Sequence, residues 1–441
     1  MPNKIDLLIE ARWIAPVEPD TLLEHHAIAI DAGSIIAILP AQEARARFTP
    51  RERFTLDDHI VIPGLVNLHT HTAMSLMRGL ADDLPLMTWL EQRIWPTEAK
   101  HVSRQFVLDG TRLACAEMLL GGITCFNDMY FHPDAAAEAA ASLGMRASIG
   151  ITALEFPTAY ANDMDDYLTK GLAAQERWRT HPLITFCLAP HAPYTVSDGS
   201  FGRIQTLSAQ LDLPIHCHVH ETQAEIENGV ASHGDRPLAR LRAMNILGPN
   251  FIGVHTVHLD AEEIRLLAEN GCSVAHCPTS NLKLASGIAP ISALLAAGVN
   301  VGLGTDGAAS NNRLDLFQEM RLAALLAKGT SGDAAALKAG DVLRMATLNG
   351  AAALGLNRTI GSLVPGKAAD ICAVDLSGIA MQPCYDPISH LVYVAGRDQV
   401  SHVWVAGKCC VISNRLRAEG ENDLKNSVGL WQNKLEIRPL A

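Results

Sequence analysis

The chain has 441 residues, 48% of them hydrophobic and 19% charged, which is enough for a large domain with a smaller partner and an ample core. Its formal net charge of -12, without any lysine or arginine run, argues against nucleic acid or an anionic membrane as a partner. No apolar run reaches the roughly 18 residues of a membrane-spanning helix and no signal-peptide pattern is present, so we expect a cytoplasmic protein.

The ten cysteines lie mainly in apolar, strand-like segments and include no Cys-x-x-Cys pair. Buried, reduced thiols fit this distribution better than disulfides or a cysteine metal site. Reduced thiols are in turn expected in a cytoplasmic protein.

The first 60 residues carry short segments of alternating hydrophobicity, at 6–11, 27–31 and 34–39, which predict β-strands. From residue 61 the pattern changes to strands that alternate with helices. We therefore expect residues 1–60 to form part of a small β-domain.

From residue 61 onward, short apolar runs rich in branched residues alternate with helical stretches. The predicted strands are 62–68, 123–129, 146–153, 184–191, 214–221, 251–257, 272–278 and 299–306. Predicted helices between them include 106–120, 134–143, 201–210, 261–269 and 291–297. This alternation fits a closed (β/α)₈ barrel over residues 61–364. A doubly wound open sheet is the alternative, but no Gly-x-Gly-x-x-Gly turn follows the first strand.

A turn-rich hinge at 361–370 ends the barrel pattern. Strand patterns then resume at 371–375, 390–394, 400–405 and 408–411. We expect residues 365–441 to complete a small β-sandwich domain with residues 1–60. The predicted fold class is therefore α/β, a (β/α)₈ barrel of the TIM type with a β-sandwich domain built from both chain ends.

The sequence His69-Thr70-His71 lies at the end of the first predicted barrel strand. Side chains two apart in a strand point to the same face, so these imidazoles could bind one metal ion. A His-x-His pattern is common by chance, and alone it is weak evidence.

Other metal-competent side chains fall at the carboxyl ends of the predicted strands, where a barrel of this kind forms its active site. They are His191, His216, His218, His220, Glu221, His255, His276 and Asp306. Together they predict a metal site at that end of the barrel.

Five segments of this chain resemble motifs of the amidohydrolase superfamily. They are 63–71 (PGLVNLHTH), 215–222 (IHCHVHET), 253–255 (GVH), 276–287 (HCPTSNLKLASG) and 303–311 (LGTDGAASN). The resemblance covers essentially the whole chain. Within this superfamily, the chain is similar to the mononuclear branch of deaminases and chlorohydrolases that contains the 5′-methylthioadenosine/S-adenosylhomocysteine deaminases.

The resemblance implies one divalent metal ion, usually zinc, held by a set of four ligands: His69, His71, His218 and Asp306. Strand spacing alone does not choose among His216, His218 and His220; the resemblance favours His218 because the family's glutamate follows its histidine ligand by three residues, as Glu221 does. The fourth strand ends without the lysine that bridges two metals in binuclear relatives. The roles of His216, His220 and His276 stay open.

The implied chemistry is hydrolytic deamination. Zinc lowers the pKa of bound water from about 15.7 toward about 7, which supplies hydroxide for attack on an aminopurine carbon. The resemblance makes Glu221 the general acid that protonates the ring nitrogen, Asp306 the acceptor of the water proton, and His255 the residue that orients the hydroxide.

For substrate binding, the resemblance points to Glu98 as the carboxylate that accepts two hydrogen bonds from a ribose diol. It implies that His191 contacts the sugar or the purine edge. Trp89 could supply apolar contact to the 5′ substituent, or it could pack in the core or in a loop. Arg146 resembles an arginine that binds the amino-acid carboxylate of S-adenosylhomocysteine in some members. No second arginine follows it at 153–160, which favours methylthioadenosine.

The expected partner is thus a small nucleoside substrate, and we expect a homo-oligomer. The alternatives are a guanine or oxopurine deaminase, a cytosine deaminase or a chlorotriazine hydrolase with the same metal site, and a relative that binds without catalysis. The diol-binding carboxylate favours a nucleoside over a free base. The complete set of predicted metal ligands argues against the non-catalytic relative.

Overall fold

The computed structural model describes residues 2–417 and 421–435. Its contacts divide the chain into two compact units. One comprises the described residues of 1–66, 117–125 and 315–418, and the other those of 67–116, 126–314 and 419–441. The domain boundaries predicted after residues 60 and 364 stay a prediction.

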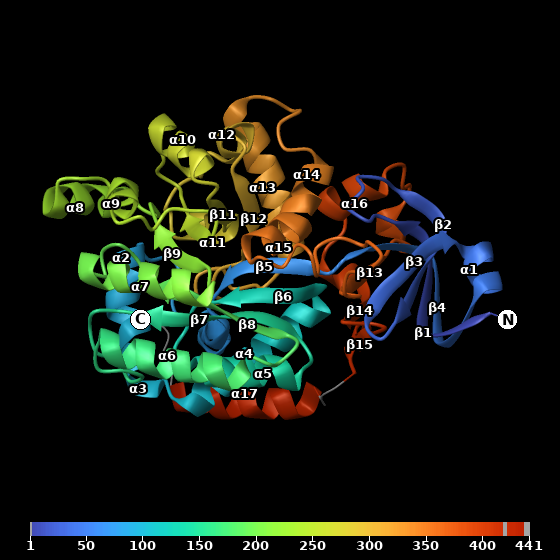
Figure 1. Ribbon diagram of the computed structural model, residues 1–441, viewed down its shortest axis with the longest axis horizontal. Helices are drawn as coiled ribbons and strands as arrows, with labels where there is room; N and C mark the ends of the chain where they lie inside the picture. The colour runs from blue at the N-terminus through green and yellow to red at the C-terminus, as the bar shows by residue number, and fades with distance from the viewer. Residues whose placement is uncertain (1, 418–420, 436–441) are drawn as a thin grey trace. The chain divides into compact units, whose positions relative to one another are not determined.

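The first unit is built on one eight-stranded mixed sheet with the order β16-β15-β14-β13-β4-β1-β2-β3, so both chain ends contribute to it (Figure 1). β1 and β4 are parallel and their other neighbours are antiparallel. The strands are β1 (Asn3–Ile14), β2 (Leu23–Asp31), β3 (Ser34–Pro40), β4 (Phe48–Pro63), β13 (Ile371–Asp375), β14 (Val400–Val405), β15 (Lys408–Ile412) and β16 (Arg415–Leu416).

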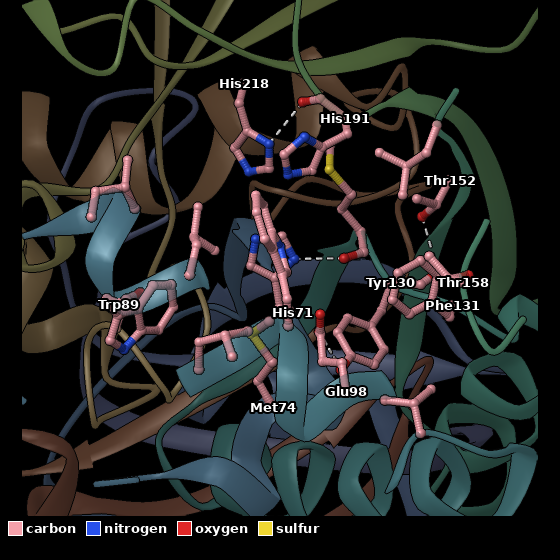
Figure 2. Close-up of a pocket in the computed structure, with 18 of the residues that line it drawn as sticks. His71, Met74, Trp89, Glu98, Tyr130, Phe131, Thr152, Thr158, His191 and His218 are labelled. Carbon is pink, nitrogen blue, oxygen red and sulfur yellow. Dashed lines mark hydrogen bonds between the residues drawn. The ribbon is translucent and has the colours of Figure 1, made fainter. Parts of the chain in front are cut away.

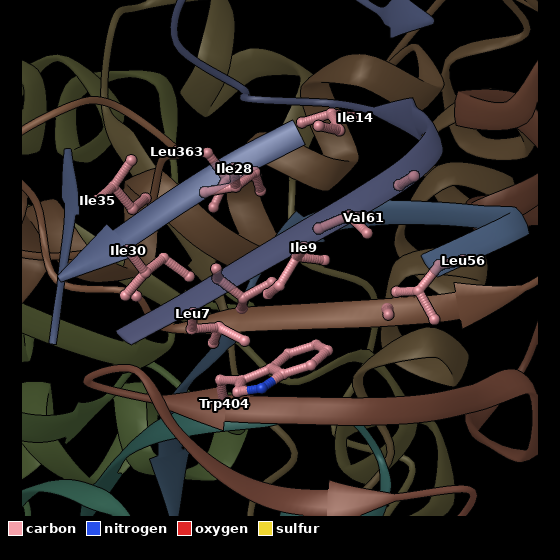
Figure 3. Close-up of a cluster of buried hydrophobic side chains, with 14 of the residues drawn as sticks. Leu7, Ile9, Ile14, Ile28, Ile30, Ile35, Leu56, Val61, Leu363 and Trp404 are labelled. Atoms are coloured by element: carbon pink, nitrogen blue, oxygen red, sulfur yellow. The ribbon is translucent and has the colours of Figure 1, made fainter. Parts of the chain in front are cut away.

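Alternating apolar residues of these strands share one core. Leu7 and Ile9 of β1 pack with Ile28 and Ile30 of β2 and with Trp404 of β14, all nearly inaccessible to solvent (Figure 3). Burying branched and aromatic side chains on one face is what stabilises a sheet of this kind. The predicted β-domain from both chain ends is therefore confirmed.

The second sheet is the predicted barrel. Its eight strands follow the order of the sequence, β5 to β12, and the ladders from β7 to β12 are parallel. The strands are β5 (Leu65–Thr70), β6 (Ile123–Asp128), β7 (Arg146–Ala153), β8 (Ile184–Pro190), β9 (Ile215–Val219), β10 (Phe251–His255), β11 (Ser273–His276) and β12 (Asn300–Leu303).

Contacts between the first and last strands nearly close the ring. The backbone N–H of Asp306, which follows β12, donates to the carbonyl of His69 in β5 at 3.0 Å. The amide of Asn67 exchanges two hydrogen bonds with Thr305, at 2.8 and 2.9 Å. These contacts bring the His69 segment and Asp306 together.

The helices alternate with the strands along the chain. Those up to β9 are α1 (Ala41–Arg47), the 3₁₀ helix η1 (Thr72–Met77), α2 (Leu86–Trp89), the π-helix η2 (Leu90–Ile94), α3 (Trp95–His101), α4 (Arg104–Leu120), α5 (Pro133–Ser142), α6 (Met164–Trp178) and α7 (Asp198–Leu211). Those after it are α8 (Gln223–His233), α9 (Pro237–Ala243), α10 (Ala261–Glu269), α11 (Pro278–Lys283), α12 (Ile291–Ala296), α13 (Leu316–Ser331), α14 (Ala339–Arg344), η3 (Met345–Asn349), α15 (Gly350–Ala353), η4 (Ile379–Met381), α16 (Pro387–Tyr393), η5 (Arg397–Gln399) and α17 (Glu421–Leu435).

Two predicted strands differ from the structure. The apolar run 62–68 is divided at Gly64 between β4 of one sheet and β5 of the other. A Cβ at Gly64 would lie 2.1 Å from the hydroxyl of Thr124, so only glycine fits this close approach. The strand predicted at 390–394 is wrong: the segment belongs to α16, whose N-cap Asp386 accepts two backbone N–H bonds and whose first residue is Pro387.

None of the described helices is both long enough and apolar enough to cross a membrane.

Candidate active site

A cavity of about 370 Å³ lies at the carboxyl ends of the barrel strands. Its lining includes His71 after β5, His191 after β8, His218 of β9, His255 of β10 and Asp306 after β12. Figure 2 shows His71, His191 and His218 directed into one space, with Glu98 and Trp89 on other sides of it. The volume falls in the range of small-molecule sites.

Side chains from three strand ends converge beside this cavity. Oδ1 of Asp306 lies 3.2 Å from Nε2 of His69 and 3.3 Å from Nε2 of His71. Nε2 of His218 lies 3.2 Å from Nε2 of His69. Potential ligand atoms of His69, His71 and Asp306 lie within 4.8 Å of one another, as do those of His69, His218 and His255. The structure thus brings the four predicted ligands together.

The other ring nitrogen of each histidine faces a partner. Nδ1 of His71 donates to the Met129 carbonyl at 2.5 Å, and Nδ1 of His218 donates to the His191 carbonyl at 2.8 Å. Nδ1 of His69 lies 3.1 Å from Nε2 of His216. With protons on Nδ1, the Nε2 lone pairs of His69 and His218 point at each other. A shared cation relieves that repulsion, so these residues fit a metal ion.

Burial keeps these rings in the form that binds metal. It lowers the pKa of His69 to about 4 and the pKa of His218 well below its ordinary value. A neutral imidazole is the ligand form. The rings of His69 and His218 are therefore uncharged at pH 7.

Several residues at or just after the ends of the strands have a left-handed backbone. The φ angle is +57° at His220, +69° at His255 and +61° at Asp306. This conformation is costly for residues other than glycine and is concentrated at functional sites. It turns the chain sharply at the edge of the cavity.

Hydroxyl groups hold the second carboxylate oxygen of Asp306. Ser280 donates to Oδ2 at 2.6 Å and Ser310 at 3.1 Å, while the N–H of Gly307 donates to Oδ1 at 2.7 Å. Sequence reasoning missed both serines, although each lies inside a motif segment. Their hydrogen bonds orient the carboxylate toward the histidines.

Glu221 and His255 face each other across the cluster. Oε2 of Glu221 lies 3.8 Å from Nε2 of His255, and that nitrogen lies 4.0 Å from Oδ2 of Asp306. Nδ1 of His255 donates to Oδ1 of Asn281 at 2.8 Å. Burial raises the pKa of Glu221, which favours the protonated form that a proton donor needs.

Glu98 of α3 lines the same cavity. The phenol of Tyr130, a residue just after β6, donates to its Oε1 at 2.7 Å (Figure 2). Burial raises the pKa of Glu98 to about 7, and the hydrogen bond from Tyr130 counters part of that increase. Sequence reasoning missed Tyr130; its place at the carboxyl end of the second barrel strand was the available signal.

Of the remaining predicted binding residues, His191 and Trp89 line the cavity and Arg146 does not. Nδ1 of His191 lies 3.0 Å from the hydroxyl of Thr195, and the indole of Trp89 donates to the Ala81 carbonyl at 3.1 Å. Arg146 begins β7, and its guanidinium donates to the Pro182 carbonyl at 3.3 Å. The expectation that it reaches the substrate is corrected, because the cavity lies at the other end of the strands.

The histidines left open by the sequence have separate surroundings. His216 contacts His69, whereas Nε2 of His220 accepts the N–H of Leu238 at 3.1 Å. His276 is buried, and the potential metal-binding groups among the described residues do not include it. Asp128, which ends β6, was also missed: it accepts the N–H of Thr72 at 2.7 Å and fixes the turn after His71.

Known proteins resemble this chain over nearly its whole length. Residues 60–410 match the model of the amidohydrolase family. The chain is 48% identical over 441 residues to a 5-methylthioadenosine/S-adenosylhomocysteine deaminase of Saccharophagus degradans, with 99% of each chain covered.

Solved structures are similar over the same extent. An adenosine deaminase from Xanthomonas campestris with bound zinc has a TM-score of 0.97 and 48% identity, with 99% of each chain covered. An atrazine chlorohydrolase from Arthrobacter aurescens complexed with zinc has a TM-score of 0.89 and 26% identity, covering 96% of this chain and 99% of that one.

Proposed function

The chain belongs to the amidohydrolase family, and we propose that it hydrolyses adenine nucleosides to the inosine analogue and ammonia. The preferred substrate is 5′-methylthioadenosine, ahead of S-adenosylhomocysteine and adenosine. The observation that carries this proposal is that one cavity is lined both by residues of the His/Asp cluster and by Glu98. The relatives named above support the substrate class.

We assign one divalent metal ion, zinc, to His69, His71, His218 and Asp306. Three imidazole nitrogens and a carboxylate oxygen are a usual donor set for zinc. A metal ion of this kind supplies a nucleophile at neutral pH by lowering the pKa of water toward about 7. The hydrogen bonds on the outer ring nitrogens keep the ligand atoms directed inward.

The protein's own acids and bases handle the protons. Water adds to C6 of the purine while Glu221 protonates the adjacent ring nitrogen, and Asp306 accepts the proton that the water loses. Nε2 of His255, the ring nitrogen that faces the cluster, hydrogen-bonds the water and orients it. Asp306 then passes its proton to the departing amino group and the C6–N bond breaks with release of ammonia, while the proton of the added hydroxyl returns to Glu221 as the C6 carbonyl forms. The raised pKa of Glu221 supports its role as the acid.

The substrate's other groups determine specificity. Oε1 of Glu98 already accepts a bond from Tyr130, and its remaining lone pairs accept the two ribose hydroxyls. His191 contacts the sugar or purine edge, and Trp89 contributes apolar surface. The described residues that line the cavity include no lysine or arginine, which supports a small, uncharged 5′ thioether over an amino-acid chain.

The same fold and metal chemistry also serve other rings and leaving groups, as the name of the chlorohydrolase indicates. A free base or a chlorotriazine has no ribose diol to pair with Glu98. Leaving that carboxylate unpaired costs binding energy, so these substrates are disfavoured.

We further propose that the enzyme acts in the cytoplasm as a homo-oligomer. All ten cysteines are free thiols, and nine of them are buried, which supports a reducing compartment. Ile379 and Tyr385 are each 91% exposed and give a candidate contact between subunits. Light scattering of the purified protein measures the subunit number directly; a monomer would contradict this part.

The function is tested by incubating zinc-loaded protein with methylthioadenosine, S-adenosylhomocysteine, adenosine, adenine, guanine, cytosine and a chlorotriazine, while ammonia and chloride are measured. We expect ammonia from the adenine nucleosides, most rapidly from methylthioadenosine. Ammonia from a free base alone, or chloride from the triazine alone, would refute the proposal.

A further inference from the structure

The carboxylate of Glu225 binds the two backbone N–H groups that precede the turn into α8. Oε1 accepts from the N–H of His220 and Oε2 accepts from the N–H of Glu221, both at 2.9 Å. Glu225 as a whole is 8% exposed. A buried carboxylate therefore holds the main chain of the residue assigned as proton donor.

This contact differs from an ordinary helix cap. α8 has Thr222 as its N-cap, and the hydroxyl of Thr222 accepts the N–H of Glu225 at 3.2 Å. In a capping box, the acidic residue at the third helical position would accept the N–H of the cap residue itself. Glu225 instead reaches the two residues before the cap, so its bonds fix the segment leading into the helix.

That segment requires support. His220 has a left-handed φ of +57°, a costly conformation for a residue with a Cβ. The side chain of Glu221 is itself held loosely, because Ser286 donates to its Oε1 at 3.4 Å and the closest nitrogen of His255 is 3.8 Å away. The direction in which Glu221 points is thus set largely by its backbone.

We propose that Glu225 is a positioning residue for the proton transfer by Glu221, acting through the paired N–H groups of His220 and Glu221. This inference rests on the proposed function, which makes Glu221 the proton donor. Glu225 is itself neither one of the residues that line the cavity nor a member of the His/Asp cluster, so it acts only through the backbone that it holds.

Glu225→Gln tests the proposal, because an amide keeps the shape but replaces one acceptor oxygen by an N–H group that opposes a backbone N–H. We expect kcat for methylthioadenosine to fall about tenfold or more, with KM changed less than about threefold, since small displacements of reacting groups are costly in rate. Zinc content, measured by elemental analysis, should stay at the wild-type level.

The matched control is Thr222→Ala, which removes the cap bond of the same helix but leaves the carboxylate of Glu225 in place. It should lower the melting temperature while kcat stays within about twofold of wild type. Equal losses of kcat in the two variants would show that only helix stability matters, and would overturn the proposal.

A double-mutant cycle separates positioning from a general structural effect. In the Glu221→Gln background there is no proton donor to position, so adding Glu225→Gln should lower kcat by less than about twofold further. A full additional loss would overturn the proposal. If Glu225→Gln does not fold, Glu225→Asp, which keeps two acceptors on a shorter arm, takes its place in the cycle with the same expected outcome.

The cycle also distinguishes this inference from the proposed function. Unchanged kcat in Glu221→Gln alone would refute the role of Glu221 and, with it, that of Glu225. A large loss in Glu221→Gln with unchanged kcat in Glu225→Gln would refute the positioning role alone.

Discussion

The phenol of Tyr130 donates a hydrogen bond to Oε1 of Glu98 at 2.7 Å, inside the cavity that both residues line. Burial raises the pKa of Glu98 to about 7, and this bond opposes the rise. The ionised carboxylate is the form that accepts both ribose hydroxyls. Tyr130 therefore helps to keep Glu98 ready for a nucleoside at neutral pH.

This relationship predicts a pH dependence. Because Glu98 is ionised above its pKa, the ratio of kcat/KM for a nucleoside to kcat/KM for free adenine should rise as the pH increases through about 7. Groups that act on the purine ring titrate in the same way for both substrates, so their effect cancels in this ratio. Tyr130→Phe should move the rise to higher pH, and an unchanged profile in that variant would contradict the role of the bond.

Removing the carboxylate of Glu98 should weaken selection for the ribose. Glu98→Ala is expected to lower kcat/KM for methylthioadenosine by about 100- to 10,000-fold, since each of the two bonds to the charged acceptor contributes about 1.5–3 kcal/mol. The value of kcat/KM for adenine should fall far less, so the ratio between methylthioadenosine and adenine becomes smaller. Glu91→Ala, at an exposed site on η2 outside the cavity lining, is the matched control. Equal losses for both substrates would exclude a diol contact.

Arg146 should have no part in substrate selection. Arg146 is the first residue of β7, and its guanidinium donates a hydrogen bond to the carbonyl of Pro182. Arg146→Met removes this bond and is expected to lower the melting temperature. The ratio of kcat/KM for S-adenosylhomocysteine to that for methylthioadenosine should stay within about twofold of wild type. A selective loss of S-adenosylhomocysteine turnover would mean that the side chain does reach the substrate.

Metal removal should destabilise the fold, because the histidines and Asp306 are buried against one another. Free zinc at about a hundredfold excess over its Kd adds about 2.7 kcal/mol to the unfolding free energy. The protein should therefore melt at a higher temperature with zinc than in the presence of a chelator. His69→Ala should abolish this difference. His276→Ala removes a buried histidine outside the cluster and should retain it; loss of the zinc response in both variants would contradict the ligand assignment.

The barrel and the position of the site followed from short-range patterns. Runs of branched apolar residues marked the strands, and polar residues at their carboxyl ends marked the cavity, because parallel strands bring those ends to one rim. His69, His218 and Asp306 lie in separate segments of the sequence; this rule placed them at one rim, and the family resemblance singled them out as ligands.

The strand pattern at 390–394 was overridden by a local signal that sequence reasoning missed, the N-cap residue Asp386 followed by Pro387 at the start of α16. Other features depend on contacts that no local pattern encodes. Arg146 matched a family position in sequence, but its place at the start of β7 puts it at the wrong end of the barrel. The bonds of Tyr130 to Glu98 and of Glu225 to the backbone depend on side-chain directions, which only the folded chain defines.

The most direct test of the central claim is the reaction of zinc-loaded protein with methylthioadenosine in ¹⁸O-labelled water, followed by mass spectrometry and an ammonia assay. Hydrolytic deamination predicts one ammonia for each nucleoside consumed and one ¹⁸O atom bound to C6 of the purine base of the product, with turnover lost in Glu221→Gln at unchanged zinc content. Release of free adenine without ammonia, or label at any other position, would contradict the account.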